Sequence, residues 1–190
     1  MVKLIQNIKK RNLRIFICSI LLMTFSFGLF GPFYLIFINK IGGSIENFGI
    51  AVGIITLSGA LMSFIAGRYS DKLGRKPLLI IGGYASAIIV FLYTIISSLW
   101  QLYLLQILSG LITAVFEISE LSFLADFTEK QKRGVEIGRY FAFVGVIEAL
   151  AIFLGGFIIG KFDFEIVFYI VSIIFVISTT IMFKLKECTN

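Results

Sequence analysis

The sequence has no histidine, and only two cysteines and two prolines occur among its 190 residues. Histidine is the commonest general base and metal ligand, so its absence counts against acid–base catalysis and against a zinc site. Cys18 and Cys188 lie near opposite ends of the chain, which favours neither a metal-binding framework nor a disulfide. Because no pairing of a nucleophile with a base is visible either, an enzyme is the least favoured class. We expect no metal and no cofactor.

Charge is also scarce. Charged residues make up 15 % of the chain, whereas soluble domains average about 25 %. Hydrophobic residues make up 58 %, with 21 Phe, and the mean hydropathy is +1.00. Apolar segments in a bilayer must satisfy their own backbone hydrogen bonds, as helices or as closed barrels. Barrel strands would alternate apolar and polar residues, but these runs are continuously apolar. The composition therefore predicts an all-α, polytopic membrane protein embedded in a lipid bilayer.

Six apolar segments are long enough to cross a membrane, and they occupy residues 13–38, 47–66, 78–97, 99–124, 137–160 and 166–183. Each is near the ~20 residues that span a hydrocarbon core about 30 Å thick. The connections between them are short, without a soluble domain or a low-complexity stretch. We therefore expect a single domain over residues 1–190, built as one bundle of six transmembrane helices.

The net charge of +6 is distributed unevenly over the connecting segments. Fifteen of the 17 Lys and Arg residues lie in the N-terminal segment, in the tail, or in and just beyond the turns after the second and fourth spans. The two exceptions are Lys40 and Lys161. This bias predicts that the basic segments and both termini are cytoplasmic. It indicates a multi-pass protein of the cell membrane and argues against a nucleic-acid partner.

The fourth span has most of the polar residues, and they recur at intervals of three and four. The positions are Tyr103, Gln106, Gly110, Thr113, Glu117 and Glu120. Such spacing places them along one side of a helix. Since a charged group at bilayer depth is costly, it faces protein or a water-filled cavity. The stripe predicts a polar wall for a substrate or for protons. The alternative is that Glu120, and even Glu117, reaches the cytoplasmic interface.

Glu148 lies in the middle of the fifth span, deeper than any other ionisable residue. The energetic cost of a charge at that depth favours the protonated acid, which makes Glu148 a candidate proton carrier. The alternative is a protonated acid that is permanently bonded to a neighbouring carbonyl or hydroxyl group.

Two spans have stripes of small residues. The second span has Gly49, Gly53, Thr56, Ala60, Ser63 and Gly67, and the fifth has Gly138, Ala142, Gly145, Ala149 and Gly156. Small residues allow the close backbone approach by which membrane helices associate. The stripes predict packing either within the six helices or against a second six-helix unit.

The segment 67–76 reads GRYSDKLGRK and forms a compact charged turn between two apolar spans. It resembles the cytoplasmic motif between the second and third helices of the major facilitator superfamily, whose consensus is Gly-x-Leu-Ala-Asp-Arg-x-Gly-Arg-Lys. The matching residues are Gly67, Asp71, Gly74, Arg75 and Lys76; Lys72 keeps the charge, Ser70 keeps the small size, and Tyr69 departs. Gly74 can adopt a positive φ in a tight reversal, and the planar guanidinium of Arg75 suits a carboxylate partner.

The segment 125–134, ADFTEKQKRG, looks like the matching turn after the fourth span of that family. The resemblance implies that Asp126 pairs with Arg75, and that Asp71 meets the N-terminal end of a helix in another half of the transporter. The implied cytoplasmic gate comprises Gly67, Asp71, Lys72, Gly74, Arg75, Lys76, Asp126 and Arg133. The whole chain resembles the N-terminal six-helix half, in a style nearest to the drug-and-proton antiporter branch.

Two positions depart from that branch. Gln106 stands where the branch has an Arg that assists proton transfer, which argues against proton coupling by that route. The segment 151–156, AIFLGG, retains only the final glycine pair of the antiporter motif Gly-Pro-x-x-Gly-Gly and lacks the proline that kinks the helix.

The resemblance implies transport of a small molecule, with protons as a candidate coupling ion, by a chain that supplies one of two six-helix halves. Three alternatives follow. The chain works as a homodimer or with a separately encoded half; it is a truncated remnant without transport of its own; or it is a scaffold or regulatory subunit that binds a partner through its second and fifth spans. Neither the substrate nor the direction of transport can be read from these residues.

Overall fold

The computed structural model describes residues 2–128, 131 and 133–185, and the side chains among them except those of residues 2–10 and Asp71. Asp71 lies within a helix, but its side chain, which was expected to meet a helix of another half, is outside the described part of the chain. The cations Lys130 and Lys132 are outside it as well.

The described chain is all-helical. Its elements are α1 (Val2–Phe30), the 3₁₀ helix η1 (Gly31–Phe33), α2 (Tyr34–Lys40), α3 (Ile45–Leu73), α4 (Arg75–Leu92), α5 (Leu99–Phe127), α6 (Arg133–Ile159) and α7 (Phe164–Met182). Six spans within the described residues have the length and hydropathy to cross a membrane. The predicted fold class, an all-α polytopic membrane protein, is confirmed.

The first span was expected to be one continuous helix over 13–38, and it is interrupted instead. Pro32 lies in the 3₁₀ turn that separates α1 from α2. Proline lacks the N–H that an α-helix interior requires, and its ring clashes with the preceding turn. The break places Tyr34 at the start of α2.

The third span was expected over 78–97, but α4 begins at Arg75 and ends at Leu92. After it, the N–H of Thr94 bonds to the carbonyl of Phe91 (3.0 Å) and that of Ile95 bonds to Leu92 (3.0 Å), in the tighter pattern of a turn. The Thr94 hydroxyl also donates to the Phe91 carbonyl (2.7 Å), so the side chain competes for the backbone acceptor.

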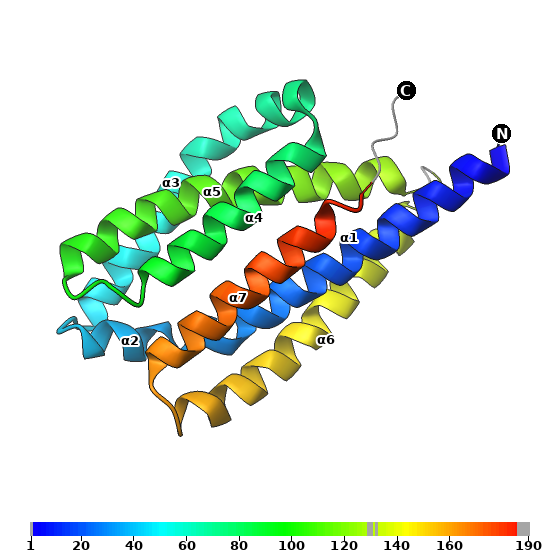
Figure 1. Ribbon diagram of the computed structural model, residues 1–190. Coiled ribbons are helices and arrows are strands. Elements are labelled where there is room, and N and C mark those ends of the chain that lie inside the picture. The colour runs from blue at the N-terminus through cyan, green and yellow to red at the C-terminus, as the bar shows by residue number, and fades with distance from the viewer. Residues whose placement is uncertain (1, 129–130, 132, 186–190) are drawn as a thin grey trace.

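The six spans form an open arc in the packing order α3, α5, α4, α7, α1, α6. The start of α1, the α3–α4 and α5–α6 turns and the end of α7 lie toward one end of the bundle (Figure 1). The connections α2–α3, α4–α5 and α6–α7 lie at the other end (Figure 1). The ends of the arc, α3 and α6, pack on α5 and α1 respectively and form no packed interface with each other among the described residues.

Two crossings in the arc depend on glycine. A side chain at Gly110 of α5 would meet the backbone of α3, with its Cβ 2.9 Å from the nitrogen of Gly59. A Cβ at Gly28 of α1 would lie 2.8 Å from that of Ala151 in α6. Close backbone approach of this kind strengthens the packing between membrane helices. These glycines therefore determine how near α3 comes to α5 and α6 comes to α1.

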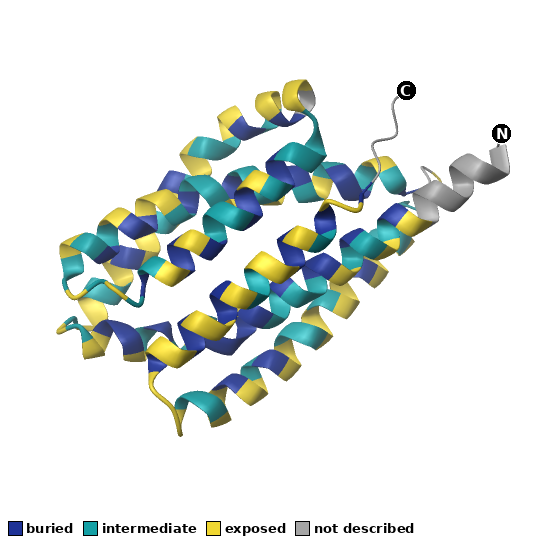
Figure 2. Cartoon of the chain, viewed as in Figure 1, coloured by how far each residue is buried: buried dark blue, intermediate teal, exposed yellow. Residues whose placement is uncertain are grey.

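Buried side chains form two clusters at different heights. One includes Leu29, Phe37, Tyr93, Leu102 and Phe168, and the other includes Phe16, Leu79, Phe123, Tyr140 and Met182. The helices at the ends of the arc are much less buried: 6 % of the most apolar stretch of α3 and 11 % of that of α6 are buried, against 39–44 % for the other spans. Exposed residues accordingly run along α3 and α6 (Figure 2).

Candidate functional site

A cavity of about 490 Å³ lies in the arc, and every one of the six spans contributes to its lining. Along α5, α6 and α7, its lining residues fall between the residues of the two buried clusters. Thr113 and Glu117 line the cavity and are exposed, so it opens to the surface of the bundle. This volume is within the range of about 300–1,000 Å³ that is typical of small-molecule sites.

The polar stripe of α5 lies largely in this cavity. Gln106, Thr113, Glu117 and Glu120 line it, together with Ser109. Tyr103 does not line it; its hydroxyl instead accepts a hydrogen bond from Asn47 Nδ2 of α3 (2.9 Å). Tyr103 was expected on the cavity wall, and the reason for the difference is that it lies one turn nearer the start of α5, where α3 covers it.

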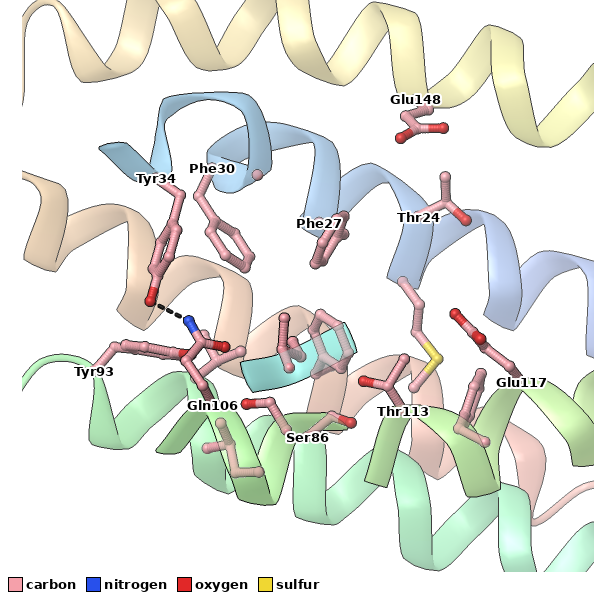
Figure 3. A pocket seen from close by; sticks show the side chains of 18 of the residues that line it. Thr24, Phe27, Phe30, Tyr34, Ser86, Tyr93, Gln106, Thr113, Glu117 and Glu148 are labelled. Atoms are coloured by element: carbon pink, nitrogen blue, oxygen red, sulfur yellow. Dashed lines mark hydrogen bonds between the residues drawn. The ribbon is translucent and has the colours of Figure 1, made fainter. Parts of the chain in front are cut away.

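One end of the cavity is neutral and polar. Gln106 of α5 is 3 % exposed, and its Nε2 donates a hydrogen bond to the hydroxyl of Tyr34 in α2. The ring of Tyr34 lies edge-to-face on that of Tyr93, the residue that directly follows α4, with centroids 6.0 Å apart. Gln106, Tyr34 and Tyr93 therefore gather from α5, from α2 and from the end of α4 (Figure 3). The break at Pro32 starts α2 at Tyr34 and so helps to place its hydroxyl here.

The other end of the cavity is acidic. Glu117 extends from α5 and Glu148 from α6, on opposite sides of the space beside Thr24 (Figure 3). Glu120, one turn further along α5, accepts a hydrogen bond from the hydroxyl of Tyr140 in α6. Among the described residues, no Lys or Arg lines the cavity. The structure thus brings together all three of the carboxylates that were singled out from the sequence.

Sequence reasoning missed several lining residues. They are Thr24, Tyr34, Ser86, Tyr93 and Ser109, with apolar walls that include Phe27, Phe30, Phe116 and Phe175. The polar members of this set are single hydroxyl groups in apolar spans, and that pattern could have drawn attention to them. The aromatic members carry no such signal, because aromatic residues occur in all six spans.

The charged turns lie at the end of the bundle where α1 starts. Gly74 joins α3 to α4 with a φ of 85°. Arg75 Nε lies 2.9 Å from Asp126 Oδ2, so the ion pair implied by the resemblance is present and links the start of α4 to the end of α5. Lys76 Nζ donates to the carbonyl of Leu185 (2.6 Å), and Arg133 Nη2 to that of Ala125 (2.8 Å). Lys72 is exposed.

Of the six glycines in the small-residue stripes of α3 and α6, five are turned away from the packed helices, and Gly156 lies against Phe33. A Cβ added at Gly49, Gly53 or Gly67 of α3 would meet nothing within 4 Å, and the same holds at Gly138 and Gly145 of α6. The glycines used inside the bundle are different ones, such as Gly59 and Gly110. Of the two interpretations of the stripes, packing within the six helices is therefore not supported for these positions.

Six membrane-spanning helices around an open cavity with polar groups at its two ends define this chain as a polytopic membrane protein with a solute-sized site. The family model of the Major Facilitator Superfamily matches residues 16–187, and the chain belongs to this family of membrane transporters.

Several curated proteins are similar to it. The uncharacterised MFS-type transporter YitZ of Bacillus subtilis is 35 % identical over 162 residues, which cover 85 % of this chain and 99 % of YitZ. The multi-drug resistance efflux pump PmrA of Streptococcus pneumoniae is 31 % identical over 183 residues, covering 94 % of this chain and 46 % of PmrA. The class B tetracycline resistance protein of Escherichia coli is 28 % identical over 150 residues, 36 % of its length. The chain thus spans nearly all of YitZ but under half of the two resistance proteins.

Proposed function

We propose that the chain is one half of a secondary transporter that moves a small molecule through a cavity between two six-helix bundles. The observation that supports this most directly is the open cavity with its polar ends, flanked by exposed glycines of α3 and α6. Transporters of such architecture alternate access by rocking two bundles about a site near the bilayer midplane. A second bundle, either a second copy of this chain or a separate chain, would cover the open side.

We further propose proton-coupled efflux across the cell membrane, with the basic turns and both termini in the cytoplasm. The name of the pneumococcal relative, an efflux pump, favours this direction. Glu117, Glu120 and Glu148 are the candidate proton carriers, because they are the acidic groups of the cavity. Gln106 cannot exchange a proton at physiological pH, so the coupling would run through the carboxylates.

Transport can be tested with the purified full-length chain in proteoliposomes. An imposed pH gradient should drive movement of a fluorescent dye into vesicles that contain the chain, and Glu117→Gln should reduce it. Glu165→Gln is the matched control, because Glu165 is exposed and bonds to Lys40 outside the acidic cavity. Dye movement equal to that in empty vesicles would contradict transport by this chain alone or as a homodimer.

The second bundle can be tested by disulfide crosslinking in native membranes. Gly53→Cys in α3 and Gly145→Cys in α6, in a background without Cys18 and Cys188, place thiols on the two exposed stripes. An adduct of twice the chain's mass identifies a second copy, and an adduct of another mass identifies a separate chain. Absence of both adducts would contradict contact of these two stripes with a second copy of the chain. A partner captured in the absence of any transport would favour the scaffold or regulatory alternative.

A further inference from the structure

The charged residues at one end of the bundle are only partly paired within the chain. Among the described residues, five lie at or beside the α2–α3 and α6–α7 connections: Lys40, Glu46, Lys161, Asp163 and Glu165. Lys40 Nζ lies 3.3 Å from Asp163 Oδ1 and 3.4 Å from Glu165 Oε1, so one cation holds two carboxylates. Glu46 and Lys161 are left over. Both are exposed, and neither forms an ion pair within the described part of the chain.

Glu46 and Lys161 lie on helices at opposite ends of the arc. Glu46 is in the first turn of α3, and Lys161 follows the last residue of α6 by two positions. Among the described residues, α3 and α6 form no packed interface with each other. Glu46 lies three residues before Gly49 and seven before Gly53, so it is on the side of α3 where an added Cβ meets nothing within 4 Å. No helix of the same chain covers this side.

The distribution of cations limits how a second copy can face the first. Fifteen of the 17 Lys and Arg residues lie in the N-terminal segment, the tail or the basic turns, so every copy should enter the membrane in the same orientation. Two arcs in the same orientation that face each other are related by a twofold axis along the membrane normal. This axis brings α3 of each copy against α6 of the other.

The same axis brings the two unpaired charges together. The start of α3 and the end of α6 lie at the same end of the bundle (Figure 1). The rotation therefore brings Glu46 of each copy towards Lys161 of the other, and the contact occurs twice. If the second copy were inverted in the membrane, α3 would meet α3 and Glu46 would face the basic turns only at a distance of a whole bundle.

A second copy explains these charges better than lipid does. The apolar side chains exposed on the two helices, such as Phe64 of α3 and Phe157 of α6, suit lipid as well as protein. Lipid and water, however, place no requirement on the signs of the charges at the ends of α3 and α6. A twofold interface does, because a surface that binds its own copy must be complementary to itself. Opposite charges on the two end helices of one arc meet that requirement.

We propose that two copies of this chain associate across the open side of the arc, with α3 of each against α6 of the other. Glu46 of each copy pairs with Lys161 of the other on the side opposite the basic turns. This inference rests on the proposed function in taking the open side as the place of the second bundle, and it names that bundle as a second copy. Association can be measured without transport.

Self-association can be measured by energy transfer in liposomes. Full-length chains, each fused at the C-terminus to a donor or an acceptor fluorescent protein, are reconstituted over a range of protein-to-lipid ratios. The unsubstituted chain should associate. Glu46→Lys and Lys161→Glu should each weaken self-association by about tenfold, because both ion pairs of the dimer become contacts between like charges.

Mixing the two variants gives the decisive comparison. When donor chains with Glu46→Lys meet acceptor chains with Lys161→Glu, each contact again joins a cation to a carboxylate. The mixture should therefore associate as tightly as the unsubstituted chain, which also shows that both variants fold. Glu165→Lys is the matched control: it makes the same change in net charge at the same end of the bundle, but Glu165 belongs to the pair with Lys40. It should leave association unchanged.

Three results would overturn the proposal. One is energy transfer by the unsubstituted chain no greater than that to an unrelated membrane protein at the same density. Another is a mixture of the two variants that associates no more tightly than either variant alone. The third is a loss of association in Glu165→Lys equal to that in Glu46→Lys, which would attribute the effect to net charge. Association without any transport would contradict only the proposed function, and transport that requires a separate chain would contradict only this inference.

Discussion

The glycines of α3 and α5 allow a direct test of which helix faces are packed inside the bundle. Gly110→Ala introduces a methyl group at the crossing of α5 with α3, where its Cβ would lie 2.9 Å from the nitrogen of Gly59. That neighbour is backbone and cannot rotate aside, so the helices must separate. Gly53→Ala places the same methyl group on the outer stripe of α3, where nothing lies within 4 Å.

Comparing Gly110→Ala with Gly53→Ala separates the effect of helix packing on stability from the effect of helix propensity. Each substitution gains about 1 kcal/mol of helix propensity, and this gain cancels between the two variants. What remains is the overpacking at Gly110, about 1–3 kcal/mol. We therefore expect Gly110→Ala to be less stable than Gly53→Ala by that amount.

The measurement is reversible unfolding in mixed micelles, followed by circular dichroism against the mole fraction of denaturing detergent. Equal stabilities of the two variants, or a less stable Gly53→Ala, would refute the assignment of the α3–α5 crossing to Gly59 and Gly110. Gly53→Leu should give the same unfolding midpoint as Gly53→Ala, because nothing lies within 4 Å of a Cβ at this position. It should still reduce transport, because the larger side chain would obstruct a second bundle and not the first.

Three further predictions concern the charged residues. Asp126→Asn breaks an ion pair whose side chains are 28 % and 51 % exposed, so it should lower stability by no more than about 1 kcal/mol, measured in the same unfolding assay; a larger loss would show a structural role. Glu117→Gln and Glu148→Gln should each reduce the pH dependence of dye transport in proteoliposomes, and an unchanged profile in both would remove them as proton carriers. Asp71→Asn should impair transport more than membrane insertion, as judged by protein content of the membrane fraction, whereas lost insertion would assign Asp71 to topology.

The charged turn and the carboxylates could be identified from local patterns. The segment 67–76 carries its information in adjacent residues, and the resemblance of 67–76 and 125–134 to the family's turns implied the ion pair of Arg75 with Asp126. The intervals of three and four along α5 placed Gln106, Thr113 and Glu117 on one side of a helix, and that side lines the cavity. Tyr103 shares the same intervals and nevertheless lies outside the cavity, because α3 covers that level of α5. The periodicity of polar residues shows which side of a helix they share, but not which other helix packs against that side.

The sequence by itself determined the class of this protein. Continuous apolar runs leave no alternative to membrane helices, since unsatisfied backbone groups are too costly in lipid. Their number and the distribution of cations follow directly from composition along the chain.

Tertiary structure decided which glycines pack inside the bundle and which stay exposed, where the first span breaks, and which hydroxyl meets Gln106. Gly49 and Gly59 are both glycines of α3, yet of these two only Gly59 faces a neighbouring backbone. The physical reason is that packing and hydrogen bonding depend on distances between helices, and one chain's local pattern does not contain those distances.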